Sequence, residues 1–203
     1  AQIVEINDGS ELQAARCSLG CLGVITEITL SCIPQYFVQE KYTFCESIED
    51  ILELEKQAPL QQFFLMPHSW RFLAQERVVS SECRRRGLAI VFRVYWFIVI
   101  DVGMHLTLKL FASIVKSKKL IHFFYHSVAP SLISSRWVVT DRSDRTLVMK
   151  HDLFRHLEIE LFVTRSNVME AASFVKDVLQ LADNANYQLS QQTVQKLEKA
   201  GFL

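Results

Sequence analysis

The clearest signals along the chain are stretches in which apolar and polar residues recur at strand or helix spacing. Residues 2–6 form a short apolar-rich run, and residues 24–30 place their side chains on two faces with a period of two, so both predict strands. Residues 7–10 have the composition of a turn and helix cap, and a short helix is expected to follow to about Cys17. The opening region is therefore expected to run strand, helix, strand.

The next segments predict a compact unit. Residues 36–44 predict a strand, and Ser47 is placed to cap a helix that runs from residue 48 to about 57. Residues 63–66 and 71–79 then predict a hairpin. This order favours an α+β fold with helices on one face of a mostly antiparallel sheet.

Residues 88–115 are almost entirely apolar and allow three interpretations. The stretch could be a buried helix of the domain, a helix lying on a membrane surface, or a membrane span of about 20 residues. Basic residues flank it on both sides, which suits a membrane-surface helix and equally suits the solvated ends of a buried one. Burial is the favoured interpretation. The flanking basic residues are Arg84, Arg85, Arg86, Lys116, Lys118 and Lys119.

The last third of the chain has strong local patterns. Residues 136–140 and 145–149 predict a hairpin, and residues 156–163 alternate like a half-buried strand. A helix over residues 167–182 is predicted by an apolar stripe and by Asn167 and Glu170, which resemble a capping box. Residues 191–200 predict a short final helix that Gly201 ends.

Charge and cysteine content narrow the class of protein. The chain has 203 residues, with 22 basic and 22 acidic side chains, so nothing favours a nucleic-acid partner. An odd number of cysteines without paired metal spacing indicates buried thiols in a reducing, cytoplasmic setting. The chain begins without Met or a signal peptide, which indicates an excerpt of a longer protein. The cysteines are Cys17, Cys21, Cys32, Cys45 and Cys83.

Two pairs of side chains are candidates for chemistry, one of histidines and one of glutamates. His122 and His126 have the four-residue spacing of metal-binding helices, but no third ligand is evident, so two half-buried histidines among aromatics are favoured and no metal site is predicted. Glu158 and Glu160 share one strand face, where they could act as acid and base or simply be solvated.

A glycine hinge joins the first helix to the following strand. Gly20 and Gly23 allow the backbone to approach a flat or phosphorylated cofactor closely, although such a pair is also common in a tight turn or helix cap. The run around it reads Ala-Arg-Cys-Ser-Leu-Gly-Cys-Leu-Gly-Val-Ile-Thr-Glu-Ile-Thr-Leu. It resembles the end of the flavin domain in the vanillyl-alcohol-oxidase-like (PCMH-type) FAD oxidases, in particular the sugar-1,4-lactone oxidase and alditol oxidase branch.

The resemblance implies a cofactor, a division of the chain and a reaction. Residues 1–33 would end a PCMH-type FAD-binding domain, and residues 34–203 would form an α+β substrate or cap domain that is truncated at its C-terminus. The parent protein would transfer a hydride from a CH–OH group of a sugar lactone or polyol to FAD. The FAD-lining residues would be Arg16, Ser18, Gly20, Gly23, Val24 and Ile25.

The resemblance also implies what the chain does not contain. The family's pyrophosphate-binding loop and flavin-tethering histidine have no counterpart here, nor do its later substrate-binding Arg and Lys. Glu158 and Glu160 are candidate substrate-binding residues, because their strand resembles a strand of the family's substrate domain. The alternative is a truncated, non-catalytic fragment that acts as an interaction or membrane-surface module through residues 88–119.

Overall fold

The computed structural model describes residues 3–18, 20–81, 86–148 and 162–202, and it divides into two units, Ala1–Pro34 and Gln35–Leu203. The first unit contains helix α1 (Gly9–Arg16), as predicted. The strands expected at its two ends are absent from the described residues 3–6 and 24–30, so both predictions are wrong. A strand needs a neighbour to bond its backbone groups, and these segments have none among the residues that the structure describes.

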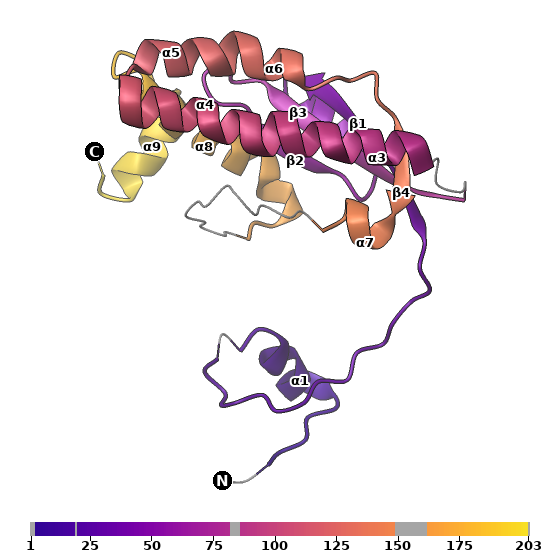
Figure 1. The fold of residues 1–203 in the computed structure, drawn as a ribbon. Coiled ribbons are helices and arrows are strands. Elements are labelled where there is room, and N and C mark those ends of the chain that lie inside the picture. Colours follow the sequence, from indigo (N-terminus) through magenta and orange to yellow (C-terminus); the bar gives the residue numbers. More distant parts are fainter. Residues whose placement is uncertain (1–2, 19, 82–85, 149–161, 203) are drawn as a thin grey trace. The chain divides into compact units, whose positions relative to one another are not determined.

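The second unit is built on a four-stranded antiparallel sheet with strand order β2-β3-β1-β4 (Figure 1). The expected α+β class is therefore confirmed. Its strands are β1 (Phe37–Cys45), β2 (Gln62–Leu65), β3 (Phe72–Ser80) and β4 (Val139–Arg142).

Strands β2 and β3 form the predicted hairpin, and β1 pairs with β3 along its whole length. The later hairpin predicted over 136–149 is wrong, because β4 pairs with β1 and residues Ser143–Thr146 form the short helix α7. A long-range strand partner thus replaces the local one.

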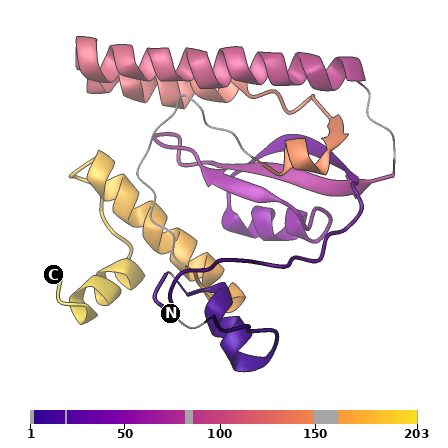
Figure 2. The ribbon, with the colours of Figure 1, turned by 60° about the horizontal axis from the view of Figure 1, so that its bottom comes forward.

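Helices cover both faces of the sheet rather than one, which corrects the sequence expectation (Figure 2). Helix α2 (Ile48–Glu55) lies on one face, and the predicted capping box is present, with Ser47 accepting a hydrogen bond from the Asp50 backbone. Its buried residues pack with Phe72 and Ala74 of β3. Strand β3 is buried on both sides for most of its length, and this burial is what a sheet between two helical layers requires.

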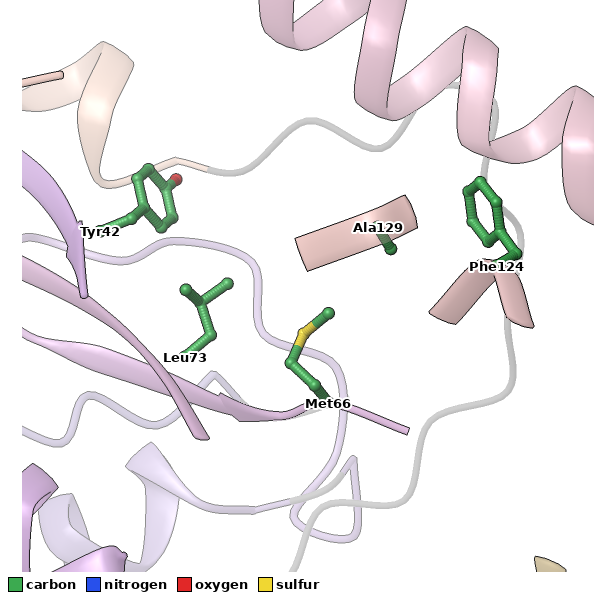
Figure 3. Close-up of a cluster of buried hydrophobic side chains, with 5 residues drawn as sticks. All are labelled: Tyr42, Met66, Leu73, Phe124 and Ala129. Atoms are coloured by element: carbon green, nitrogen blue, oxygen red, sulfur yellow. The ribbon is translucent and has the colours of Figure 1, made fainter. Parts of the chain in front are cut away.

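The opposite face is covered by a helical layer built from the apolar stretch and the segments after it. In it, Phe124 and Ala129 pack with Tyr42, Met66 and Leu73 of the sheet unit (Figure 3). The elements of this layer are α3 (Arg86–Tyr95), the π-helix η1 (Trp96–Met104), α4 (His105–Lys109), the π-helix η2 (Leu110–Val115), α5 (Lys118–Phe123), the π-helix η3 (Phe124–Val128) and α6 (Ala129–Leu132).

The continuous helix over Gly87–Val115 is long and apolar enough to cross a membrane by length and composition. The favoured expectation that this helix is buried is wrong, because only 6% of its most apolar 18-residue stretch is buried. Phe92 and Trp96 face the sheet, whereas Val94, Ile98 and Ile114 are exposed.

The C-terminal segment contains the two predicted helices. Helix α8 (Val168–Asp183) follows the 3-10 turn η4 (Arg165–Asn167), and α9 (Gln191–Lys199) is capped by Ser190. The expected capping box at Asn167 is wrong, since its side chain makes no capping hydrogen bond. The predicted strand over 156–163 lies largely outside the described residues, and 162–163 have no regular structure.

Of the four cysteines that the structure describes, one is buried as expected. Cys45 is buried in the core beneath α2, where burial raises the pKa of its thiol. Cys17, Cys21 and Cys32 are exposed in the first unit, which corrects the expectation for them. The described residues of this unit form one helix and no strand, which leaves too little core to bury the three thiols.

Candidate functional site

The residues predicted to line FAD lie in the first unit, after the end of α1. Arg16 ends the helix, and the backbone N–H of Cys21 donates to the Ser18 carbonyl at 2.8 Å, closing a turn. Gly23, Val24 and Ile25 follow on an exposed segment, with the Val24 side chain 92% exposed.

Both hinge glycines have a left-handed backbone, with φ of +79° at Gly20 and +112° at Gly23. A Cβ added to either would meet nothing within 4 Å, so the space beside the backbone is open. This open backbone leaves room for a flat group to approach from one side. Nothing in this unit encloses a cofactor from the other side among the residues described.

The other two candidate residues, Glu158 and Glu160, lie outside the described residues. His122 and His126 were expected to be half-buried, and both are exposed. Their rings stack with centroids 6.0 Å apart, so they do share a helix face.

A different set of residues forms a cavity of about 430 Å³ in the second unit. It lies between the face of the sheet that carries Tyr42 and the helix α3–η1. Its floor is polar and buried, and its helical wall carries aromatic rings beside the charged Arg93 and Asp101. The floor and wall residues that carry the argument are Glu40, Tyr42, Gln75, Arg77, Phe92 and Trp96.

The floor is a hydrogen-bonded network across β1 and β3. The register places Glu40 opposite Arg77 and Tyr42 opposite Gln75, so all four side chains share one face. Arg77 Nε lies 2.9 Å from Glu40 Oε2, and the Gln75 amide donates to the same oxygen at 2.8 Å. The Gln75 amide also lies 2.7 Å from the Tyr42 hydroxyl.

The charges in this floor are balanced. Burial and the neighbouring Glu40 carboxylate raise the pKa of Tyr42, so its hydroxyl stays protonated and donates to Glu40. Both oxygens of the buried Glu40 carboxylate have partners: Oε1 accepts from Tyr42, and Oε2 accepts from Gln75 and Arg77.

Two buried polar atoms of the network have no hydrogen-bond partner: the acceptor Gln75 Oε1 and the donor Arg77 Nη2. Such atoms cost free energy unless a ligand or water satisfies them. A hydroxyl group can donate to one and accept from the other.

Aromatic rings form the opposite wall. The Trp96 ring stacks on Tyr42 with centroids 4.9 Å apart, and Phe92 lies 5.5 Å from Trp96. The cavity therefore offers a polar end for a hydroxyl and an apolar surface for a carbon skeleton.

Sequence reasoning missed this cavity. Glu40 and Arg77 each lie in a short polar run within a strand, Gln39–Lys41 in β1 and Gln75–Arg77 in β3, and such runs look like solvated strand faces. Their sequence separation of 37 residues concealed the pairing, which depends on the register between β1 and β3.

No family model matches the chain. It is 39% identical to a long-chain alcohol oxidase of an uncultured marine euryarchaeote over 202 residues, which is all of this chain and 42% of that protein. It is also 41% and 38% identical over 69 residues to the L-gulonolactone oxidases of Bos taurus and Mus musculus, which covers 32% of this chain and 16% of each relative. The chain thus spans less than half the length of these relatives. The homologues support a FAD-linked oxidase family.

Proposed function

We propose that this chain is part of a FAD-dependent oxidoreductase that oxidises a CH–OH group of a small molecule. The observation that carries the proposal is the pair of buried, unpartnered atoms at Gln75 and Arg77, one acceptor and one donor. The names of the homologues, an alcohol oxidase and two gulonolactone oxidases, agree with a hydroxyl-bearing substrate.

Within this proposal the first unit ends the PCMH-type FAD-binding domain, and the second is the substrate domain. Backbone groups from Ser18 to Ile25 would line FAD, with Arg16 beside them. FAD, when bound, supplies the acceptor for the hydride that leaves the substrate carbon. Gln75 and Arg77 hold and orient the substrate hydroxyl, and Glu40 fixes the position of both side chains.

Two substrate classes follow from different observations. A sugar lactone or polyol agrees with the motif resemblance and with the 69-residue match to gulonolactone oxidases. A long-chain alcohol agrees with the match over the whole chain and with the aromatic wall formed by Phe92 and Trp96. Turnover of a series of primary alcohols and sugar lactones by the full-length protein separates the two classes.

The cofactor is tested by expressing the full-length protein that contains this chain. A yellow product with flavin absorption bands is expected, and a colourless folded product contradicts the proposal. Gly23→Ala should reduce bound flavin, because a φ of +112° strains any residue with a Cβ and the backbone of the hinge would have to shift. Gly201→Ala is the matched control, since it has φ of +74° after α9 and should keep the flavin.

The substrate site is tested by Gln75→Leu, which removes the free acceptor and keeps the volume. We expect KM to rise or kcat to fall with flavin content unchanged. Thr43→Val in the same strand pair, on the opposite sheet face, is the control. Equal turnover in Gln75→Leu and the unaltered protein contradicts the assignment.

A second candidate function is contact with a membrane surface through residues 88–119, either as an addition to the oxidase or as the role of a non-catalytic fragment. It is favoured by the exposed apolar face of the helix Gly87–Val115 and by the basic residues that flank it in sequence. The anionic surface of a cytoplasmic leaflet is the partner that this charge pattern fits.

Flotation with anionic liposomes tests this contact. Ile98→Asp with Ile114→Asp should abolish co-flotation, because both side chains lie on the exposed face. Val79→Asp, at an exposed position of β3 outside the helix, is the control and should float like the unaltered protein. Absence of flotation in the unaltered protein contradicts the membrane contact.

A further inference from the structure

Three side chains from separate segments meet beside the helical layer. His68 lies in the turn between β2 and β3, His122 on α5, and Asp183 is the last residue of α8. Their ligand atoms all lie within 4.8 Å of one another. None of them contributes to the cavity described above.

His68 is held in an unusual backbone conformation. Its φ is +62°, a region that non-glycine residues avoid, and such strain persists only where surrounding bonds impose it. Here the turn is closed by Met66 N–H donating to the Arg71 carbonyl at 2.8 Å and Trp70 N–H donating to the Met66 carbonyl at 2.9 Å. The turn therefore presents the His68 ring in a fixed direction.

The Nδ1 atom of His68 is buried and lacks a hydrogen-bond partner. The Asp183 carboxylate oxygen lies 3.0 Å from it, but the pair does not have hydrogen-bond geometry. His68 and Asp183 therefore meet as an ion-pair contact at 3.0 Å without a directed hydrogen bond, and both atoms are of the kind that coordinates a cation. A cation bound to both atoms would satisfy them.

The surroundings provide shielding on one side and access on the other. The His122 ring lies 5.0 Å from the His68 ring, and Tyr125 lies 5.8 Å away. His122 and Asp183 are exposed, so an ion can enter from solvent.

We propose that His68, His122 and Asp183 bind a divalent transition-metal ion of the zinc class. Two imidazoles and one carboxylate are ligands that Zn²⁺ accepts, with water completing a tetrahedron. Ligand bonds of about 2.0 to 2.2 Å would place the ligand atoms roughly 3 to 4 Å apart, a small contraction from the observed cluster.

The bound ion would join the β2–β3 turn, α5 and the end of α8. Its role is a structural cross-link between segments that are more than fifty residues apart in sequence. It does not depend on the oxidase proposal, and its tests do not measure activity.

Calorimetric titration with Zn²⁺ should show one ion bound per chain when the exposed thiols Cys17, Cys21 and Cys32, which would bind zinc themselves, are replaced by serine in every form compared. His122→Ala removes an exposed ligand without disturbing the core, and Asp183→Asn keeps the side-chain shape. Each is expected to weaken Zn²⁺ binding by at least about tenfold, since even supporting partners of metal ligands have effects of that size. Zn²⁺ should raise Tm in the unaltered protein and have little effect on Tm in either variant.

His126→Ala is the matched control, because His126 is exposed on the same face as His122 but is not part of the cluster. It should bind Zn²⁺ like the unaltered protein. Absence of stoichiometric binding, or equal binding in all variants, overturns the proposal. A loss in His126→Ala and His122→Ala with Asp183→Asn unaffected would place the ion on the helix pair and also overturn it.

Discussion

Both units contain segments with the alternation typical of a strand, but among the described residues only the second unit forms strands. In the second unit, β1 pairs with β3 and β4, and its Val38 side chain is fully buried. In the first unit, residues 24–30 form no strand, and Val24 is 92% exposed. Alternation therefore indicates which side chains would share a face, whereas a strand forms only where a neighbour supplies hydrogen bonds.

The largest expected difference between the units is in the unfolding free energy lost when an arginine is replaced by alanine. Arg77→Ala leaves the Glu40 carboxylate buried without its cation, and such a loss typically costs about 3–5 kcal/mol of unfolding free energy. Arg16→Ala, at the exposed end of α1, should change it by less than about 0.5 kcal/mol. Urea unfolding followed by circular dichroism measures both. A small loss in Arg77→Ala would mean that solvent reaches the network.

Shortening one apolar side chain in each unit gives the next largest expected difference in unfolding free energy. Ile51 is fully buried between α2 and β3, so Ile51→Ala should cost about 3 kcal/mol from lost burial and the cavity left behind. Val24→Ala removes an exposed side chain and should cost almost nothing. The same unfolding experiment measures both variants, and a comparable loss in Val24→Ala would show that residue 24 is covered in solution.

The helix caps of the two units differ in the same way, because the cap in the second unit should contribute more to stability than the cap in the first. Ser47→Ala removes a side chain that accepts the Asp50 N–H, and we expect a loss of about 1 kcal/mol. Asp8 caps α1 without any side-chain bond, so Asp8→Ala should be nearly neutral. Thermal unfolding of the two variants measures the difference, and equal effects would contradict the assigned cap.

The smallest expected effect is on the pH profile. Burial tends to raise the pKa of Asp177, but hydrogen bonds from Ser190, Thr193 and Tyr187 outweigh it and lower this pKa. The unfolded state then binds the proton more tightly, so this stabilisation is complete above pH of about 3.9 and is lost as pH falls through the folded pKa. Asp177→Asn should flatten that part of an acid-unfolding curve, and an unchanged curve would contradict the network.

Local signals predicted much of the second unit. The α2 cap at Ser47, the β2–β3 hairpin and helices α8 and α9 follow from spacing and capping residues that lie close together in sequence. The pairing of β4 with β1 was missed because a nearby hairpin satisfied the same pattern. The exposure of the helix Gly87–Val115 could not be predicted either, since composition does not show which neighbours cover an apolar face.

The candidate sites divide in the same way. The hinge around Gly20 and Gly23 was found from sequence, because a backbone with positive φ is a local property that glycine allows. The Glu40–Arg77 floor and the cluster of His68, His122 and Asp183 were not found. Their members lie far apart along the chain.

The sequence by itself determined where most helices and the central hairpin form, because turns, caps and periodicity act over a few residues. The tertiary structure decided which strands pair, which side of the long helix faces the sheet, and which polar atoms are left unsatisfied at Gln75 and Arg77. These depend on contacts between distant segments, and no local pattern encodes the register that brings them together.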